Sequence, residues 1–359
     1  MELCSRRHGS YVAGPVMSLV KEKSFNIAGF SLKVGTEAKR AERLRRSVPY
    51  RYLLRPAISL MSRARAGRSA NSASPSRATS RSPLPADVPP ELATRIAAIG
   101  WYHSIDLGNG VVTPGFIDNR DTVRYFGLPD DLRGRRCLDI GTYDGFWAFE
   151  MERRGANEVV GIDVDSPLDH DLPLPIRRKA LAEVGGKADW KQVWDEQQAA
   201  RGLQYPGQGF ALAKEILDSK ARRENLNIYD LKPERLGTFD VVLISQLLLR
   251  LRDPQTAIEN MFSVTSENGF AIIAEPYDPD LEALERPVSE FLGTSLMGIW
   301  WRHSAKSMVR MMQTAGFDPV EEVSRFEASN REGTFHKVIL KGHVPVGAHR
   351  NEVREANER

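Results

Sequence analysis

The sequence predicts an α/β fold: a doubly wound, mostly parallel sheet of seven strands with helices on both faces. Two observations lead to this prediction. Between residues 136 and 341, short apolar segments suited to strands alternate with amphipathic segments suited to helices. The first apolar segment also leads into a glycine-bearing turn, residues 141–145, from which a helix begins, and this order is typical of a nucleoside-binding βαβ unit.

The expected elements follow one another regularly along the chain. The strands are residues 136–140, 158–162, 225–229, 239–244, 270–274, 320–326 and 335–341. The helices are residues 146–154, a segment that Asp253-Pro254 caps, and a segment that starts at Ser304 and ends at Gly316. A polar turn at residues 330–333 separates the last two strands, which predicts a terminal hairpin in the sheet.

Residues 87–130 are expected to form a smaller N-terminal part. The prolines at 89–90 suit the first turn of a helix that Gly100 ends. Asn109-Gly110, between two apolar pairs, predicts a hairpin turn. The residues between these two features are candidates for part of a lid: Trp101, Tyr102 and His103.

Charge is distributed unevenly along the 359 residues. Residues 1–86 hold 17 Lys and Arg against 4 Asp and Glu. This segment is rich in Arg and Ser, and from Ser62 to Pro85 it has almost nothing to bury, so a disordered basic arm is expected. Three explanations of the arm stay open: an organelle transit peptide, a nucleic-acid-binding arm, or an upstream extension of a chain that truly starts at Met61.

The main domain is expected at residues 131–345, followed by a polar tail at residues 346–359. The domain contains an insertion at about residues 165–215, because that crossover is longer than a single helix needs. The insertion carries a proline-rich stretch together with Trp190 and Trp194. It is expected either to cover the active site or to decorate the surface.

The cellular setting is only weakly indicated. No apolar run approaches the ~20 residues that a membrane-spanning helix needs. The two cysteines, Cys4 and Cys137, make no disulfide framework, which favours a reducing compartment. A cytoplasmic protein without a membrane partner is therefore expected, with import into an organelle through the basic arm as the alternative.

The turn after the first strand points to the kind of ligand. Asp139 precedes Gly141 and Gly145, which are four residues apart, whereas a dinucleotide site uses G-x-G-x-x-G to bring backbone close to a pyrophosphate. S-adenosylmethionine instead carries an ammonium, which suits an acid, and a carboxylate, which suits backbone N–H groups. This E/DxGxxxG pattern indicates a class I methyltransferase, with Asp139 on the ammonium; a turn-capping aspartate is the structural alternative.

Further cofactor contacts are expected where the other strands end. Asp163 ends the second strand and suits the ribose hydroxyls. Tyr229-Asp230 follow the third strand near the expected adenine amine, although Asp230 equally suits a plain loop. Ser245 follows the fourth strand, where cofactor and substrate meet. The expected cofactor-binding residues are Asp139, Gly141, Thr142, Tyr143, Gly145, Asp163, Tyr229, Asp230 and Ser245.

Several stretches together resemble one known family. They are residues 101–107 (WYHSIDL) with residues 111–115 (VVTPG), residues 138–147 (LDIGTYDGFW) and residues 247–254 (LLLRLRDP). Over about residues 90–343 the chain is similar to methyltransferases related to the tRNA wobble-uridine (mo5U34) group. The resemblance implies a class I, Rossmann-like fold and an S-adenosylmethionine-type cofactor, and it leaves the substrate open.

The chain departs from the tRNA enzymes at one position. In those enzymes a Tyr-His pair precedes the Asp-Pro position, and its tyrosine helps to hold a carboxylated form of the cofactor. This chain has Leu249-Arg250 there, and a leucine side chain cannot donate a hydrogen bond. Ordinary S-adenosylmethionine is therefore the expected cofactor.

Methyl transfer requires alignment of the reacting atoms and exclusion of water. No metal is expected, because the seven histidines are scattered without ligand-like spacing. His103 is the candidate general base for a hydroxyl acceptor, since imidazole titrates near working pH. Glu275, after the fifth strand, is a candidate to orient the substrate or take a proton. For both His103 and Glu275 a purely structural role is the alternative. Trp300-Trp301 suit either a wall of the substrate site or packing in the core.

The expected function is methyl transfer by in-line displacement to an oxygen or nitrogen, with a small-molecule acceptor favoured. A tRNA wobble uridine is the alternative acceptor. Residues 87–359 hold 33 basic against 43 acidic residues, a net charge of −10, which argues against RNA because RNA binding depends on phosphate neutralisation. A non-catalytic S-adenosylmethionine-binding module is the alternative of another class. The acid in the turn disfavours an NAD-linked oxidoreductase, and the sequence does not indicate an oligomeric state.

Overall fold

The computed structural model describes residues 23–27, 30–34, 84–85, 88–165, 169–174, 207–293 and 298–348. The chain divides into two units, Met1–Asn71 and Ser72–Arg359. In the first unit, strands β1 (Lys23–Ile27) and β2 (Phe30–Val34) pair in antiparallel fashion, which the sequence analysis did not predict. The rest of the arm before residue 84 lies outside the described residues, as do Trp190, Trp194 and the tail beyond residue 348, so the predictions made for them stay predictions.

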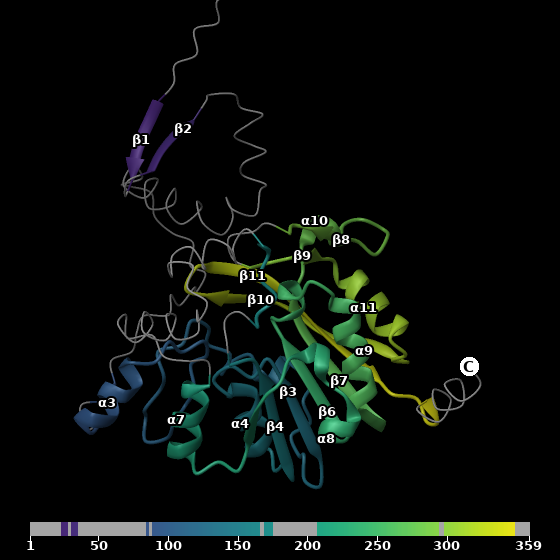
Figure 1. The fold of residues 1–359 in the computed structure, drawn as a ribbon, viewed down its shortest axis with the longest axis horizontal. Coiled ribbons are helices and arrows are strands. Elements are labelled where there is room, and N and C mark those ends of the chain that lie inside the picture. Colours follow the sequence, from purple (N-terminus) through teal and green to yellow (C-terminus); the bar gives the residue numbers. More distant parts are fainter. Residues whose placement is uncertain are drawn as a thin grey trace, which may run out of the picture. The chain divides into compact units, whose positions relative to one another are not determined.

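The second unit is built on a sheet of seven strands, which confirms the predicted fold class (Figure 1). Its spatial order is β10-β11-β7-β6-β3-β4-β5. The strands are β3 (Arg136–Ile140), β4 (Glu158–Asp163), β5 (Arg222–Asn225), β6 (Phe239–Ser245), β7 (Thr265–Pro276), β10 (Val320–Asn330) and β11 (Gly333–His343). The pairs among β5, β4, β3, β6 and β7 are parallel, and β11 is antiparallel to both β7 and β10.

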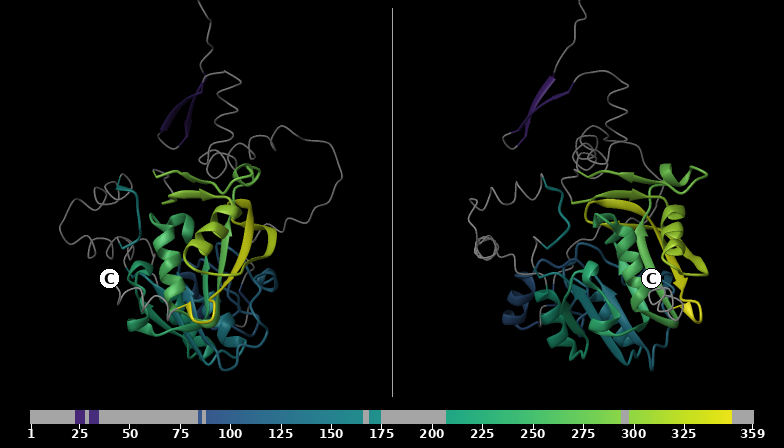
Figure 2. Two further views of the ribbon diagram at one scale, coloured as in Figure 1. Left: turned by 90° about the vertical axis from the view of Figure 1, so that its right-hand side faces the viewer. Right: turned by 45° about the vertical axis from the view of Figure 1, so that its right-hand side comes forward.

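Helices cover both faces of the sheet (Figures 1 and 2). Helices α3 (Pro90–Ala97), α4 (Phe146–Arg153) and α7 (Gln208–Leu217) contribute to one apolar core, and α9 (Pro254–Val264) and α11 (Ala305–Thr314) contribute to the other. The short helix α8 (Pro233–Leu236) lies beside α9. The alternation of side chains along each strand explains the two cores, because Leu138 and Ile140 face one and Cys137 faces the other.

Side-chain caps begin two of these helices where the sequence predicts. The carboxylate of Asp253 accepts a hydrogen bond from the Thr256 amide at 3.1 Å, and Pro254 occupies the first turn of α9. The hydroxyl of Ser304 accepts one from the Ser307 amide, also at 3.1 Å, at the start of α11. The predicted starts of both helices are therefore confirmed.

The third strand is a correction. It was expected at residues 225–229, but β5 ends at Asn225 and residues Ile228–Asp230 form a 3-10 helix, η3. The side chain of Asn227 accepts a hydrogen bond from the Tyr229 amide and turns the chain there. The apolar residues Leu226 and Ile228 are buried under this turn, whereas the strand itself is the charged edge segment RREN, so hydropathy pointed to the wrong residues.

The segment before the sheet contains the predicted hairpin turn. Asn109 and Gly110 both have positive φ, 51° and 76°, and the Val111 amide donates to the Gly108 carbonyl at 2.9 Å. These features define a type I′ turn, the kind that joins two antiparallel segments. The pairing is limited to one bridge, between Asp106 and Val112, so the hairpin is shorter than the sequence pattern suggests.

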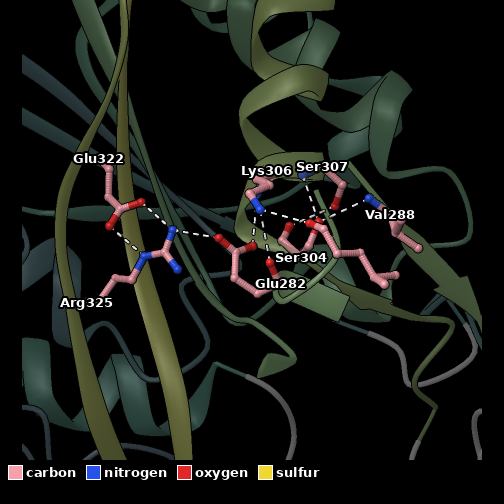
Figure 3. A network of polar contacts seen from close by, with 8 residues as sticks. Glu282, Val288, Ser304, Lys306, Ser307, Glu322 and Arg325 are labelled. Atoms are coloured by element: carbon pink, nitrogen blue, oxygen red, sulfur yellow. Dashed lines mark hydrogen bonds and ion pairs between the residues drawn. The ribbon is translucent and has the colours of Figure 1, made fainter. Parts of the chain in front are cut away.

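A small layer beyond the end of the main sheet was not predicted. It consists of helix α10 (Pro279–Glu282) and the antiparallel strands β8 (Ser289–Phe291) and β9 (Trp301–His303). Figure 3 shows how polar contacts fasten it: Arg325 of β10 binds Glu322 and Glu282, and Lys306 of α11 donates to the Glu282 carbonyl at 3.1 Å. Among the described residues, no helix is both long enough and apolar enough to cross a bilayer.

Candidate active site

A cavity of about 330 Å³ opens at the carboxyl ends of the parallel strands. It lies where the strand order diverges, since β3 has β4 on one side and β6 on the other. Ligands of doubly wound sheets bind at this kind of divergence. Part of its wall comes from the strand ends: Asp139, Gly141, Asp163, Ser245, Gln246 and Leu247. Tyr102 and His103 of the N-terminal part and residues 169–172 complete much of the rest.

Asp139 and Gly141 form the floor of this cavity. Asp139 is 1% exposed, and one of its carboxylate oxygens accepts a hydrogen bond from the Ala148 amide of α4 at 3.2 Å. Burial raises the pKa of Asp139 to about 7. Gly141 has a φ of +74°, and a Cβ there would lie 2.9 Å from Leu247 Cδ2. The turn therefore requires glycine at 141 and brings its backbone to the cavity beside a buried acid.

Asp163 occupies the end of the neighbouring strand β4 and faces the same cavity. Its two oxygens accept from the Tyr143 amide and the Val164 amide, each at 2.8 Å. Burial raises its pKa. A carboxylate has about four lone-pair sites, so two backbone donors leave Asp163 able to accept from a ligand hydroxyl.

The remaining expected cofactor residues divide into those that reach the wall and those that do not. Tyr143, Tyr229 and Ser245 line the cavity, whereas Thr142, Gly145 and Asp230 do not. A Cβ on Gly145 would lie 2.5 Å from Phe149, so this glycine serves the packing of α4. Thr142 is packed against Gly161, where a Cβ would meet its hydroxyl at 2.6 Å.

His103 is held in the cavity wall by Asp144. Its Nδ1 lies 2.6 Å from Asp144 Oδ1, and the other oxygen of Asp144 accepts from the Tyr102 amide at 2.9 Å and the His103 amide at 2.7 Å. The His103 ring also stacks on Phe146, with ring centroids 5.1 Å apart. Both members of this His–Asp pair are buried. The carboxylate at Nδ1 assigns the proton of a neutral imidazole to Nδ1 and leaves Nε2 as the basic nitrogen.

Glu275, the other expected catalytic residue, is fully buried and does not line the cavity. Its Oε1 accepts from the amides of Leu247 at 2.7 Å and Leu248 at 3.1 Å. Burial raises its pKa to about 7, and its second oxygen has no hydrogen-bond partner among the described residues. In this geometry Glu275 supports the turn after β6, which itself forms part of the wall.

Asp171 joins three segments around the cavity. Its carboxylate accepts from the Tyr229 hydroxyl and from the Arg252 amide, both at 2.6 Å, and its carbonyl accepts from the indole of Trp300. The hydroxyl of Tyr229 is thus engaged with residue 171. Trp300 secures the small β8–β9 layer to residues 169–174, which belong to the predicted insertion.

The comparisons with known proteins agree with this geometry. A family model described as a methyltransferase domain matches residues 117–322, more than half of the chain. The chain belongs to this methyltransferase family. It is a class I family whose cofactor is S-adenosylmethionine. The finer relation to the tRNA wobble-uridine enzymes stays a prediction.

Two curated methyltransferases are similar to parts of the chain. The magnesium-protoporphyrin O-methyltransferase of Rhodobacter capsulatus is 39% identical over 79 residues, which is 20% of this chain and 35% of that protein. The ubiquinone biosynthesis O-methyltransferase of Pseudomonas aeruginosa (strain UCBPP-PA14) is 26% identical over 191 residues, 48% of this chain and 65% of that protein. The chain therefore matches about a third and just under two thirds of their lengths.

A solved structure with a similar fold is the N-terminal domain of EvdMO1 with S-adenosylhomocysteine bound. Its TM-score is 0.47 at 12% sequence identity, and the match covers 71% of this chain and 95% of that domain.

The residues of the cavity fit the family cofactor on the evidence of their own chemistry. Asp139 is a buried acid that lacks a cationic partner within 4 Å among the described residues, and Asp163 retains acceptor capacity on the adjacent strand. A cation and a pair of hydroxyls would satisfy them, and S-adenosylmethionine supplies both. Among the described residues, no group of His, Cys, Asp and Glu could hold a metal ion.

Three functional features escaped the sequence analysis. Asp144 was recognised only as part of the turn, and its pairing with His103 joins residues 41 positions apart. Asp171 carried no motif, and Lys337 was not singled out within the expected strand at residues 335–341. The alternation of apolar residues in β11 could have flagged Lys337, because Phe335, Lys337 and Ile339 share one face of the strand.

Proposed function

We propose that this protein transfers the methyl group of S-adenosylmethionine to an oxygen or nitrogen of a small molecule. One observation carries the proposal: two carboxylates, Asp139 and Asp163, end adjacent strands in the wall of one cavity that also holds the His103–Asp144 pair. The first two suit the ammonium and the ribose of the cofactor, and the third group suits removal of a proton from the acceptor.

The cofactor is expected to lie across β3 and β4. Asp139 accepts from its ammonium, the backbone at Gly141 approaches its amino acid end, and Asp163 accepts from its ribose hydroxyls. Leu226 and Ile228, buried residues that line the cavity after β5, offer an apolar surface for the adenine ring. Tyr229 contributes its ring to that wall, since its hydroxyl is bound to Asp171.

The bound cofactor supplies a methyl group already activated by its sulfonium. The protein then has to align the acceptor, exclude water and, for a hydroxyl, take up its proton. His103 performs the last task through Nε2 in the proposal, and Asp144 holds the ring and stabilises the imidazolium that forms. Glu275 acts as a support for the turn after β6, because its Oε1 accepts hydrogen bonds from two backbone amides of that turn.

The choice of acceptor rests on supporting observations. Both curated relatives are named as O-methyltransferases, which supports an oxygen acceptor. The acidic balance of residues 87–359 disfavours the tRNA alternative.

A label-transfer experiment tests the proposal. The protein is incubated with S-adenosylmethionine carrying a labelled methyl group and, in separate reactions, with a small-molecule extract of its source cells and with total tRNA from them. We expect label in a small molecule, dependent on the protein and inhibited by S-adenosylhomocysteine. Label found only in tRNA would mean that the acceptor is tRNA and not a small molecule. If calorimetry showed no binding of S-adenosylhomocysteine, the proposed function would be rejected.

A further inference from the structure

Lys337 is a lysine that the fold buries completely. It lies on β11 and has no exposed surface. In the part of the chain that the structure describes, no acid forms an ion pair with Lys337 within 4 Å. Burial lowers the pKa of Lys337 to about 8. The negative charge of Glu275, on the adjacent strand β7, opposes this lowering. Its Nζ lies 5.1 Å from the centre of the Phe126 ring and donates to Gln246 Oε1 at 3.3 Å. Burying an amine away from water costs free energy, so a function for Lys337 is expected.

The contact with Lys337 fixes the side-chain amide of Gln246. An ammonium only donates, so the amide must turn its oxygen toward Lys337 and its NH₂ group away. Gln246 directly follows β6, with a left-handed φ of 57°. Its backbone N–H donates to the Ala274 carbonyl at 3.1 Å. The residue lines the cavity. Lys337 thereby presents Gln246 to the cavity as a hydrogen-bond donor.

A second donor lies in the same part of the wall. The indole N–H of Trp147 is buried without a hydrogen-bond partner among the described residues, and Trp147 lines the cavity. Its ring packs on Phe126 with centroids 4.1 Å apart, and Phe126 is the ring beneath Lys337. Contacts thus run continuously from Trp147 through Phe126 and Lys337 to Gln246, which we call the donor corner.

We propose that the donor corner binds a carboxylate of the methyl acceptor, so that the substrate class is small molecules with an anionic oxygen close to the methylated atom. This inference rests on the proposed function. Trp147 and Gln246 would donate to the carboxylate directly, and Lys337 is a positioning residue that acts through Gln246. Arg250, the one Lys or Arg among the described residues that line the cavity, adds positive charge to the same chamber.

The position of the corner favours the acceptor over the cofactor as the source of the carboxylate. Gln246 follows β6 and Lys337 lies on β11, on the side of β3 away from β4 and β5. Asp163 and the adenine surface lie on the β4–β5 side. Trp147 reaches the corner from the first turn of α4. Asp139 on β3 stands between these two sides. A cofactor held by Asp139 and Asp163 therefore extends away from the donor corner, which leaves the corner to the second reactant.

The test uses three probes of matched size and different charge: benzoate, benzyl alcohol and benzylamine. Each is titrated by calorimetry into protein saturated with S-adenosylhomocysteine. We expect benzoate to bind at least tenfold more tightly than the other two. Lys337→Met, which keeps the length of the side chain, and Gln246→Glu, which replaces the donor with an acceptor, should each reduce benzoate affinity at least fivefold. Affinity for the two other probes and for S-adenosylhomocysteine should stay within twofold.

Lys341→Met is the matched control. Lys341 lies on the same strand but donates to the Gly127 carbonyl at 2.7 Å and does not line the cavity, so its loss should leave all three probes unaffected. A merely structural role of Lys337 would not change the binding of one probe selectively. Equal binding of the three probes, or no binding of benzoate, overturns the inference.

A further arm separates the two sources of a carboxylate. If Trp147→Phe weakens S-adenosylhomocysteine but not methylthioadenosine, which lacks the amino acid end, the corner binds the cofactor carboxylate and the assignment to the acceptor is wrong. If the wild-type protein binds neither adenosine compound, it is the proposed function that fails.

Discussion

The two sides of the cavity are built in different ways. On the β3–β4 side, Asp139, Gly141 and Asp163 all come from one βαβ unit, residues 136–163. On the β6–β11 side, the groups come from three separate strands: Gln246 directly follows β6, Glu275 lies on β7 and Lys337 lies on β11. A function encoded within one supersecondary unit leaves a local sequence pattern, whereas a function assembled from distant strands leaves none.

The two sides also differ in the sign of the ionisable groups that they bury. The β3–β4 side holds acids whose pKa burial raises, and the β6–β11 side holds Lys337, whose pKa burial lowers. Both shifts disfavour the charged form in the absence of a ligand. The comparison therefore predicts that ligands of opposite charge settle on the two sides, a cation beside Asp139 and an anion beside Gln246.

The largest effect is expected at His103, which serves only the chemical step. His103→Gln should lower the rate of methyl transfer to a hydroxyl acceptor at least 100-fold, since general base catalysis contributes roughly 10²–10⁴. Affinity for S-adenosylhomocysteine should change less than threefold. The measurement is single-turnover label transfer to the acceptor found in the extract, with His336→Gln, a substitution of an exposed histidine, as the control. A rate within threefold of the wild type would exclude His103 as the base.

The next largest effect is expected at Asp163, and it tests the assignment of the β3–β4 side to the cofactor. Asp163→Ala should weaken S-adenosylhomocysteine at least tenfold, about 1.4 kcal/mol, because the ribose hydroxyls lose their acceptor. Asp230→Ala is the control: Asp230 was also an expected cofactor residue, but it lies outside the cavity wall, so its removal should have no effect on affinity. Calorimetry on both variants decides between the two aspartates, and equal losses would contradict the geometry.

The strand pattern was predictable because burial on both faces leaves a continuous apolar signal. Residues 241–244 carry it in β6, and residues 137–140 carry it in β3 with Asp139 as the one interruption; both strands were located correctly. Edge strand β5 was misplaced because its sequence RREN has no apolar signal and the buried Leu226 and Ile228 lie just after it. Side-chain burial outside regular structure imitates a strand when only hydropathy is considered.

The site was predictable to the same degree. Asp139, Gly141 and Asp163 were found because a spacing rule connects them within one unit. Gly145 obeys the same rule, but its need for glycine comes from Phe149 and Phe210 packing against it. The Asp144–His103 contact and the Lys337–Gln246 contact depend on register between distant segments, which a single sequence does not encode as a spacing.

Asp139 predicts a pH effect of about tenfold. Burial raises the pKa of Asp139 to about 7, well above the ordinary value of an aspartate. An ammonium ligand needs the ionised carboxylate, so affinity for S-adenosylhomocysteine should rise about tenfold from pH 6 to pH 8, as the ionised fraction does. Calorimetry across this range checks the slope, and Asp139→Asn should abolish it along with most of the affinity.

Stability of the free protein should change with pH in the opposite direction. A carboxyl whose pKa is higher in the folded state than in the unfolded state binds more protons when folded, so its contribution to stability is lost as pH rises from about 4 to about 7. Asp139→Asn should therefore raise the melting temperature at pH 8 relative to the wild type. A lower melting temperature there would mean that Asp139 stabilises the fold instead of serving a ligand.

The smallest effect is expected at Arg325, which tests whether the β6–β11 side depends on its outer support. Arg325 joins β10 to Glu282 of α10 and packs 5.0 Å from the centre of the Tyr277 ring, one residue beyond β7 (Figure 3). Its side chain is 33% exposed, so solvent screens these ion pairs, and Arg325→Met should cost only about 0.5–1 kcal/mol of unfolding free energy. Denaturant titration measures that cost. The side chain of Met still covers Tyr277, so the affinities for benzoate and for S-adenosylhomocysteine should both stay unchanged. A loss of benzoate affinity alone would mean that the donor corner depends on the outer layer and not on Lys337.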